Sequence, residues 1–249
     1  MAGPRRPAGR GPDAARAGKV ERRRKAVRVV KAKTASSRRW LERQLNDPYV
    51  QAAREAGYRS RAAYKLIELN ERFGLLRPGL RVVDLGAAPG GWSQVAASLV
   101  RAGKPGGGAV VAIDLSPIEL IEGVCVLQAD ALDPATLDAV RDALGADRAD
   151  LVMSDMAAPS SGHAATDHLR VMALCEAALD IAEALLAPGG GFVAKVLKGG
   201  TEKALLDRLK RGFRTVKHAK PPSSRADSAE SYVVALGYRG AGETAPDTA

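Results

Sequence analysis

Short apolar runs alternate with amphipathic segments over most of the chain, from about residue 60 to residue 238. Runs rich in β-branched residues predict strands, whereas apolar positions three and four residues apart predict helices. The predicted strands are residues 81–85, 109–114, 124–128, 149–154, 191–197, 213–218 and 232–237. The predicted helices are residues 40–49, which Pro48 should end, and residues 60–72, 92–101, 134–144, 167–186 and 201–211. We expect Pro188-Gly189-Gly190 to form the turn that closes the helix over 167–186.

This alternation of strands and helices predicts an α/β fold with a mostly parallel, doubly wound sheet. Only a short loop joins the last two predicted strands, so we expect them to form a hairpin that contains one antiparallel strand. Ligands of such sheets bind beyond the carboxyl ends of the strands. Polar residues that follow strands are therefore the first candidates for a functional site.

The loop after the first predicted strand, residues 86–91, consists of small residues. Small residues let a ligand approach the backbone closely, and a helix N-terminus leaves N–H groups free to meet it. The spacing differs from the dinucleotide fingerprint, because Ala88 and Pro89 stand where that motif needs glycine and a free N–H. An acid before the glycines suits a cationic ligand, and S-adenosylmethionine carries sulfonium and ammonium groups. We expect this cofactor to bind at Asp84, Gly86, Ala87 and Pro89.

Acidic residues occur at the ends of four successive predicted strands: Asp84, Asp114, Asp130 and Asp155. An acid after the second strand is placed to accept hydrogen bonds from both ribose hydroxyls. An acid after the third strand can reach an adenine amino group. Together the four acids indicate a ligand that contains a nucleoside. With seven strands, one of them antiparallel, they predict the Rossmann-like fold of S-adenosylmethionine-dependent methyltransferases.

Two lysines and a glutamate are the other candidates. Lys195 lies in an apolar strand pattern, where a charge is costly unless it is paired or functional. The strands before Asp155 and around Lys195 should be neighbours, which would bring these two side chains together. Lys65 lies in a basic segment that includes Tyr64 and suits contact with RNA. Glu230 stands just before the last predicted strand.

Five motifs together resemble the FtsJ-like (RrmJ/RlmE) family of 23S ribosomal RNA methyltransferases, over about residues 60–237. The motifs are Asp84-Leu85-Gly86-Ala87-Ala88-Pro89-Gly90-Gly91-Trp92-Ser93, Ser154-Asp155-Met156-Ala157, Lys195-Val196, Ser223-Ser224-Arg225-Ala226 and Glu230-Ser231-Tyr232. The resemblance implies transfer of a methyl group from S-adenosylmethionine to the ribose 2′-hydroxyl of a uridine in the 23S rRNA of the large ribosomal subunit.

The resemblance also implies the roles of individual residues. The family's catalytic Lys-Asp-Lys-Glu set falls on Lys65, Asp155, Lys195 and Glu230. The family's cofactor contacts fall on Gly90, Trp92, Asp114, Asp130 and Asp155. Lys195 is the candidate general base, a role that requires a neutral amine; alternatively it stays charged and orients the hydroxyl oxygen. The chain departs from the family where Ala157-Ala158-Pro159-Ser160 replaces the usual Ala-Pro-Asn, in a loop that borders the substrate.

Positive charge is concentrated at the N-terminus. The chain has a formal net charge of +10, and residues 1–39 hold 14 Lys and Arg against 2 Asp and Glu. We expect residues 1–39 to be a disordered basic extension that binds RNA, residues 40–238 to be the methyltransferase domain and residues 239–249 to be a disordered tail. Five further cations could form a rim that holds phosphates: Arg59, Arg61, Lys198, Lys220 and Arg225.

The composition bears on where the protein is located and on whether it binds a metal. No apolar run approaches the roughly 20 residues that span a membrane, and the N-terminus lacks a secretory signal pattern. We expect Cys125 and Cys175 to be buried rather than disulfide-bonded, and the three histidines lack metal-ligand spacing, so no metal is predicted. We therefore expect a cytoplasmic monomer whose partner is the large-subunit rRNA, with no obligate protein partner.

Several other functions fit the sequence less well. A methyltransferase acting on a base carbon would need a cysteine nucleophile at a strand end, and one acting on an exocyclic amine would carry Asn/Asp-Pro-Pro-Tyr where this chain has residues 154–157. The loop spacing argues against a nicotinamide-dependent dehydrogenase. Two alternatives stay open: a tRNA 2′-O-methyltransferase, and a non-catalytic RNA-binding ribosome-assembly factor.

Overall fold

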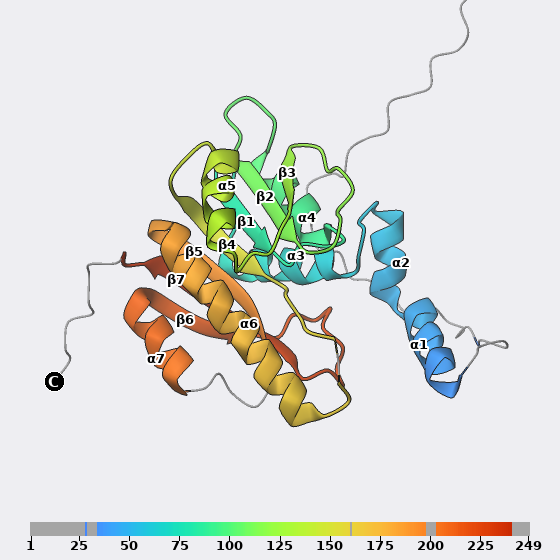
Figure 1. The fold of residues 1–249 in the computed structure, drawn as a ribbon. Helices are drawn as coiled ribbons and strands as arrows, with labels where there is room; N and C mark the ends of the chain where they lie inside the picture. Colours follow the sequence, from blue (N-terminus) through green and yellow to red (C-terminus); the bar gives the residue numbers. More distant parts are fainter. Residues whose placement is uncertain (1–27, 29–33, 160, 198–202, 241–249) are drawn as a thin grey trace, which may run out of the picture.

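One seven-stranded sheet organises the computed structural model, which describes residues 28, 34–159, 161–197 and 203–240 (Figure 1). The strands are β1 (Arg81–Leu85), β2 (Ala109–Asp114), β3 (Val124–Gln128), β4 (Ala149–Ser154), β5 (Leu186–Leu197), β6 (Phe213–Ala219) and β7 (Glu230–Tyr238). The helices are α1 (Ala35–Asn46), α2 (Pro48–Glu55), α3 (Ala62–Phe73), α4 (Gly91–Val100), α5 (Pro134–Leu144), α6 (Ala164–Leu185) and α7 (Lys203–Gly212).

The strands lie in the order β3-β2-β1-β4-β5-β7-β6. The pairs β3–β2, β2–β1, β1–β4 and β4–β5 are parallel, and β7 runs antiparallel between β5 and β6. This arrangement confirms the predicted α/β fold, the closing hairpin and the single reversed strand. The parallel strands bring their carboxyl ends to one edge of the sheet, where the predicted acids follow them.

Helices cover both faces of the sheet and thereby decide where its polar residues point. Helices α5, α6 and α7 pack on one face, and α3 and α4 pack on the other (Figure 1). Along β5, Phe192 and Val196 join the core under α6, whereas Val193 joins the core under α3 and α4. Because side chains alternate along a strand, Lys195 falls on the same side as Val193.

The predicted helix over residues 40–49 needs correction: α1 ends at Asn46, ahead of Pro48, and a second helix begins there. Pro48 is the first residue of α2, where its missing N–H would have had no helical partner in any case. Asp47 caps α2 by accepting a hydrogen bond from the Tyr49 backbone N–H at 3.1 Å. The preceding helix, α1, begins at Ala35, within the stretch that the sequence assigns to the basic extension. Most of residues 1–39 lie outside the described part of the chain.

Two smaller expectations also need correction. Cys125 is exposed rather than buried, because β3 is an edge strand whose side chains are only partly covered, whereas Cys175 of α6 is buried as predicted. Pro188-Gly189-Gly190 lies within β5 instead of forming a separate turn. The pairing of β5 with β4 shifts register between Ala149 and Leu151, which accommodates this segment.

No helix in the described part of the chain is long and apolar enough to cross a membrane. Among the same residues, no group of three or more His, Cys, Asp or Glu side chains is arranged to hold a metal ion.

Candidate active site

Two lysines and two carboxylates from four elements meet beside the carboxyl ends of β4 and β5. Lys195 Nζ lies 2.8 Å from Asp155 Oδ1, and Lys65 Nζ of α3 lies 2.8 Å from Glu230 Oε1. The cross pairs are longer: 3.7 Å from Lys65 Nζ to Asp155 Oδ2, and 3.8 Å from Lys195 Nζ to Glu230 Oε2. The four side chains are 10–16% exposed, so they form one partly buried set with no net charge.

Asp155 is at the centre of this set. Besides its lysine contacts, it accepts a hydrogen bond from the Tyr232 hydroxyl at Oδ1, over 2.7 Å. Burial alone would raise the pKa of Asp155, but the charges of Lys195 and Lys65 and the hydrogen bonds from Lys195 and Tyr232 outweigh it and hold that pKa below its ordinary value. Asp155 is therefore a carboxylate at neutral pH and can hold both lysines.

Glu230 is held from its other side by the loop between β6 and β7. The Ser224 hydroxyl donates to Glu230 Oε1 over 2.9 Å, and Ser224 is only 6% exposed. The Tyr232 ring, two residues further along β7, is fully buried against Trp92, with ring centroids 5.6 Å apart. Lys65 Nζ lies 5.7 Å from the centroid of the same tyrosine ring.

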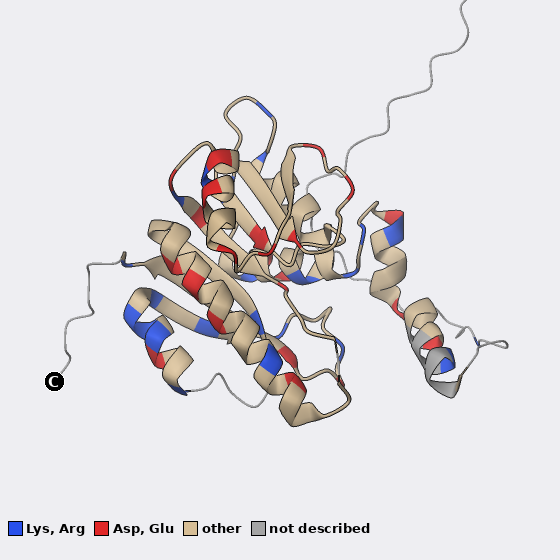
Figure 2. Ribbon diagram, in the orientation of Figure 1, with Lys and Arg blue, Asp and Glu red and all other residues tan. Residues whose placement is uncertain are grey.

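A cavity of about 520 Å³ adjoins Asp155 at the ends of β1, β2 and β4. Its polar lining includes Asp114, Asp130 and Asp155, and acidic residues lie at the lower ends of the central strands in Figure 2. Its apolar lining includes Leu115 and Leu132, which are 70% and 54% exposed. Gly86 also lines the cavity with a φ of +71°, and a Cβ there would collide with Met156 Cγ.

The two acids after β2 and β3 are fixed by backbone N–H groups. Asp114 accepts from the Ala88 N–H at Oδ2 (2.9 Å) and from the Ser116 N–H at Oδ1 (2.8 Å), and Asp130 Oδ1 accepts from the Leu132 N–H (2.9 Å). Carboxylate oxygens keep further lone pairs for hydroxyl or amino donors. Acidic acceptors between apolar walls suit a cationic nucleoside, so these residues fit S-adenosylmethionine better than a dinucleotide with its anionic pyrophosphate.

The sequence-predicted cofactor residues divide into two groups. Gly86, Asp114, Asp130 and Asp155 line the cavity, together with Ala88, which the sequence reasoning did not select. Asp84, Ala87, Pro89, Gly90 and Trp92 are not among its lining residues. The Trp92 indole N–H donates to the Ala62 carbonyl over 2.8 Å, so its ring is part of the core between α4 and α3. Contacts of these five residues with the cofactor stay predictions.

Asp84 lies inside β1, whose bounds match the predicted strand over residues 81–85, and it is fully buried. Its Oδ2 accepts a hydrogen bond from the Ser93 hydroxyl at 2.6 Å, whereas Oδ1 has no partner among the described residues. Burial raises the pKa of Asp84 to about 7; the Ser93 hydrogen bond opposes the rise, and the charges of Asp155 and Asp114 add to it.

The expected phosphate rim is bonded within the protein at each of its described members. The Arg59 guanidinium donates to three backbone carbonyls: Pro89 at 3.2 Å, Glu119 at 2.7 Å and Leu120 at 2.8 Å. These carbonyls belong to the glycine-containing loop and to the β2–β3 connection, the two segments that supply Ala88 and Ser116 to the cavity. Arg61 and Arg225 contact Asp47, Lys220 donates to two loop carbonyls, and Lys198 lies outside the described residues.

Two residues of this site have no role in the sequence reasoning. Tyr232 appears there only as the end of a motif, and Ser224 only as part of another. The hydrogen bond of Tyr232 to Asp155 depends on the pairing of β5 with β7, in which Lys195 lies opposite Tyr232. The hydrogen bond of Ser224 to Glu230 depends on how the loop before β7 folds back on the first residue of that strand.

The sheet order, the acids at successive strand ends and the cavity beside them define a methyltransferase that uses S-adenosylmethionine. The family model that matches residues 58–238 is described as FtsJ-like methyltransferase. The chain belongs to this family.

Relatives with established names are also similar to this chain. Ribosomal RNA large subunit methyltransferase E of Paramagnetospirillum magneticum is 58% identical, with 87% of this chain and 89% of the relative covered. The protein of the same name from Rhodospirillum rubrum is 56% identical, with 86% and 81% covered. A solved structure from Plasmodium falciparum, described as a ribosomal RNA methyltransferase, superposes with a TM-score of 0.65 at 28% identity, and covers 74% of this chain and all of its own.

Replacing Arg59 by alanine should weaken S-adenosylmethionine binding about tenfold, because charge-assisted hydrogen bonds to both cavity-lining segments are lost. Isothermal titration of the cofactor into the purified variant measures this directly. Lys104→Ala is the matched control, because Lys104 is a nearby cation that pairs with exposed Glu122. Unchanged cofactor affinity together with weaker RNA binding would instead make Arg59 a phosphate ligand.

Asp84 should make the stability of the cofactor-free protein fall with rising pH. Its folded pKa is about 7 against an ordinary value of 3.8, so its stabilising contribution is complete below about pH 4 and is lost as the pH rises through 7. Between pH 5 and 8 the wild type should lose roughly 2–3 kcal/mol, or about 5 °C in Tm, relative to Asp84→Asn. Thermal unfolding of both proteins at the two pH values measures this difference. If the Tm values of the wild type and Asp84→Asn change equally between pH 5 and 8, Asp84 does not titrate in this range.

Proposed function

We propose that this methyltransferase modifies the RNA of the large ribosomal subunit, at the ribose 2′-hydroxyl of a uridine in 23S rRNA. The observation that carries the proposal is the Lys65–Asp155–Lys195–Glu230 set beside a cavity suited to S-adenosylmethionine. The names of the relatives, which share 52–58% of their residues with this chain, support ribosomal RNA as the substrate class.

The chemistry divides between the cofactor and the protein. When bound at Asp114, Asp130 and Asp155, S-adenosylmethionine supplies a methyl group on a positively charged sulfur, which needs no further activation. A ribose hydroxyl is a weak nucleophile, so the protein must place its oxygen and take up its proton. Asp155 belongs both to the cavity and to the lysine set, so a hydroxyl held by the lysines lies next to the cofactor site.

Lys195 is the residue we assign to the hydroxyl. Its Nζ lies 2.8 Å from Asp155 Oδ1 and donates to the Asp155 carbonyl oxygen, also over 2.8 Å. A neutral amine has two hydrogens and one lone pair, so both contacts can be made while the lone pair stays available for the hydroxyl proton. Lys65 and Glu230 complete the set: Lys65 places a positive charge near the ribose oxygen, and Glu230 orients Lys65.

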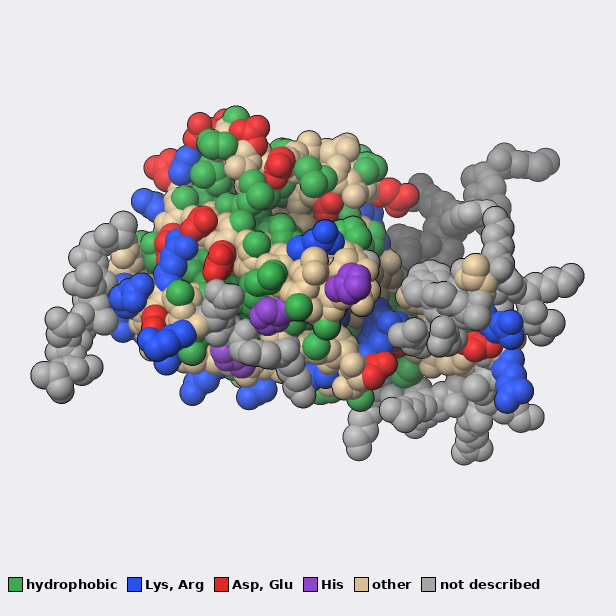
Figure 3. Space-filling model, turned by 60° about the horizontal axis from the view of Figure 1, so that its bottom comes forward, with side chains coloured by type: hydrophobic (Ala, Val, Ile, Leu, Met, Phe, Trp, Pro, Cys, Tyr) green, Lys and Arg blue, Asp and Glu red, His purple; other side chains and the backbone are tan. Residues whose placement is uncertain are grey.

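The lower side of the molecule, turned forward in Figure 3, has hydrophobic side chains across its middle, with Lys, Arg and His side chains beside them. Apolar surface suits the face of an unstacked base, and cations attract the neighbouring phosphates. This composition supports an RNA substrate with an accessible nucleotide.

Transfer of labelled methyl to three acceptors tests the proposed substrate: large subunits from a methylation-deficient strain, free 23S rRNA and bulk tRNA. After nuclease digestion, we expect the label in 2′-O-methyluridine from the large-subunit RNA. Label confined to tRNA would assign a different substrate to the same chemistry. Absence of label despite tight subunit binding would indicate a ribosome-assembly factor and contradict the assignment of Lys195.

Substitution of Lys195 tests its role as the base. Lys195→Met and Lys195→Arg should each lower kcat at least about a hundredfold, because neither side chain can accept the proton. Cofactor affinity should stay close to that of the wild type, which calorimetry checks. If Lys195→Arg keeps most of the activity, a charged side chain that orients the hydroxyl is sufficient, and if Lys195→Met loses the cofactor, the assignment is wrong.

A further inference from the structure

Asp47 is a buried acid at the junction of α1 and α2, outside the residues that match the family model. Asp47 is 8% exposed, and it precedes all four residues of the catalytic set in the sequence. One of its oxygens, Oδ1, caps α2, which leaves Oδ2 to make other contacts.

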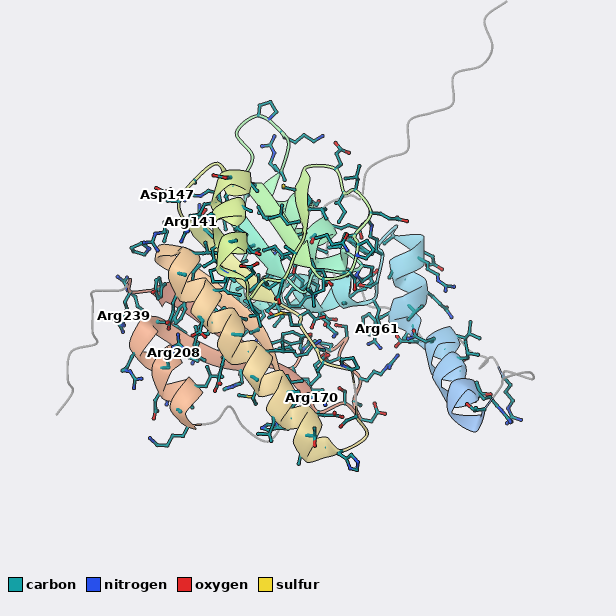
Figure 4. The ribbon with its side chains drawn as sticks, in the orientation of Figure 1. Arg61, Arg141, Asp147, Arg170, Arg208 and Arg239 are labelled. Atoms are coloured by element: carbon teal, nitrogen blue, oxygen red, sulfur yellow. The ribbon has the colours of Figure 1, made fainter. Side chains whose placement is uncertain are left out.

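Asp47 Oδ2 holds two arginines from different parts of the chain. Arg61, which precedes α3, donates to it from Nη1. Arg225, in the loop between β6 and β7, donates from Nε at 3.4 Å and from Nη2 at 3.3 Å. Figure 4 shows Arg61 where the N-terminal helices meet the rest of the molecule. One carboxylate therefore joins the N-terminal helices, α3 and the β6–β7 loop.

Arg61 also fixes the loop between β6 and β7, at Ser223. Arg61 Nη2 donates to the Ser223 carbonyl, while the Ser223 N–H and hydroxyl donate to Glu68 Oε2 of α3 at 2.8 and 2.6 Å. Both polar groups of the Ser223 backbone are thus bonded to side chains. The Ser224 hydroxyl, attached to the next backbone unit, donates to Glu230 Oε1.

We propose that Asp47 is a positioning residue for the methyl-transfer site, acting through Arg61 and the β6–β7 loop on Glu230. Its carboxylate neutralises one of two guanidinium groups that approach the same oxygen. Without that charge the two cations repel each other in a partly buried place, and the Ser223 carbonyl loses its arginine. Glu230 then loses the fixed Ser224 hydroxyl that orients it towards Lys65. The inference rests on the role proposed above for Glu230.

Asp47→Asn is a sharp test, because asparagine caps a helix as well as aspartate does and α2 should keep its N-terminus. Asp133→Asn is the matched control: Asp133 caps α5 in the same Asp-Pro arrangement, with the Ala135 N–H donating to its Oδ1 at 3.0 Å, but it is exposed. We expect Asp47→Asn to lower kcat about tenfold with an unchanged KM for S-adenosylmethionine, and Asp133→Asn to leave both close to wild type.

Two measurements separate positioning from a merely structural role. In a Glu230→Gln background, Asp47→Asn should slow single-turnover methyl transfer no further, because its effect passes through Glu230. Hydrogen exchange of the full chain should be faster over residues 220–231 in Asp47→Asn than in the wild type or Asp133→Asn, and this readout needs no RNA substrate.

Multiplicative effects of Asp47→Asn and Glu230→Gln would overturn the inference, as would unchanged exchange over residues 220–231. Full activity of Glu230→Gln would overturn it together with the role of Glu230, while leaving methyl transfer itself intact. Failure of the wild type to methylate large-subunit RNA would instead overturn the proposed function, and the exchange measurement would still decide whether Asp47 fixes the loop.

Discussion

The ionised carboxylate of Asp155 is the interaction on which the rest of the site depends. It lies beyond the end of β4, and both lysines of the set come within 4 Å of it. Two ammonium groups in a site that is 10–16% exposed would repel each other and lose hydration unless carboxylates balanced them. Asp155 and Glu230 supply two negative charges, so the set is neutral as a whole while both lysines are protonated; it carries one negative charge once Lys195 has lost the proton that its role as a base requires. Removal of any one member leaves a net charge with little water around it.

Asp155 also joins the two halves of the site. On the cavity side the charged residues are acidic, with Asp114 and Asp130 at the neighbouring strand ends, whereas on the other side they are the two lysines and Glu230. A cationic cofactor and a ribose hydroxyl that must lose a proton need opposite surroundings. Asp155 allows the two sites to lie side by side, because one carboxylate can contact the cationic cofactor on one side and a lysine on the other. The hydrogen bond from buried Tyr232 fixes where that carboxylate lies.

The sequence predicted the parts of this site that depend on strand order. Acids at strand ends and the approach of Lys195 to Asp155 follow from an α/β alternation in which β4 and β5 are neighbours. It did not predict Tyr232 as a partner, because its contact depends on the register of β7, nor Ser224, because its contact depends on the conformation of the loop before β7. The helix that begins at Pro48 was missed because a proline can start a helix as readily as it follows the end of one. Cys125 was misjudged because an apolar strand pattern does not reveal that the strand lies at an edge.

The contacts of the basic residues could not be predicted either. The sequence gives the number of positive charges but does not show which groups they contact. Arg59 and Lys220 donate to neutral carbonyls, and the exposed Glu119 carboxylate lies only 4.0 Å from Arg59, so both side chains stay cationic while most of their donors are used within the protein. Arg61 and Arg225 share one carboxylate, so this trio contributes one positive charge rather than two. A charge acts on distant phosphates through its field, whereas a direct phosphate contact needs a free donor. These cations can therefore attract RNA to the active-site side while their hydrogen bonds hold the loops that form the site.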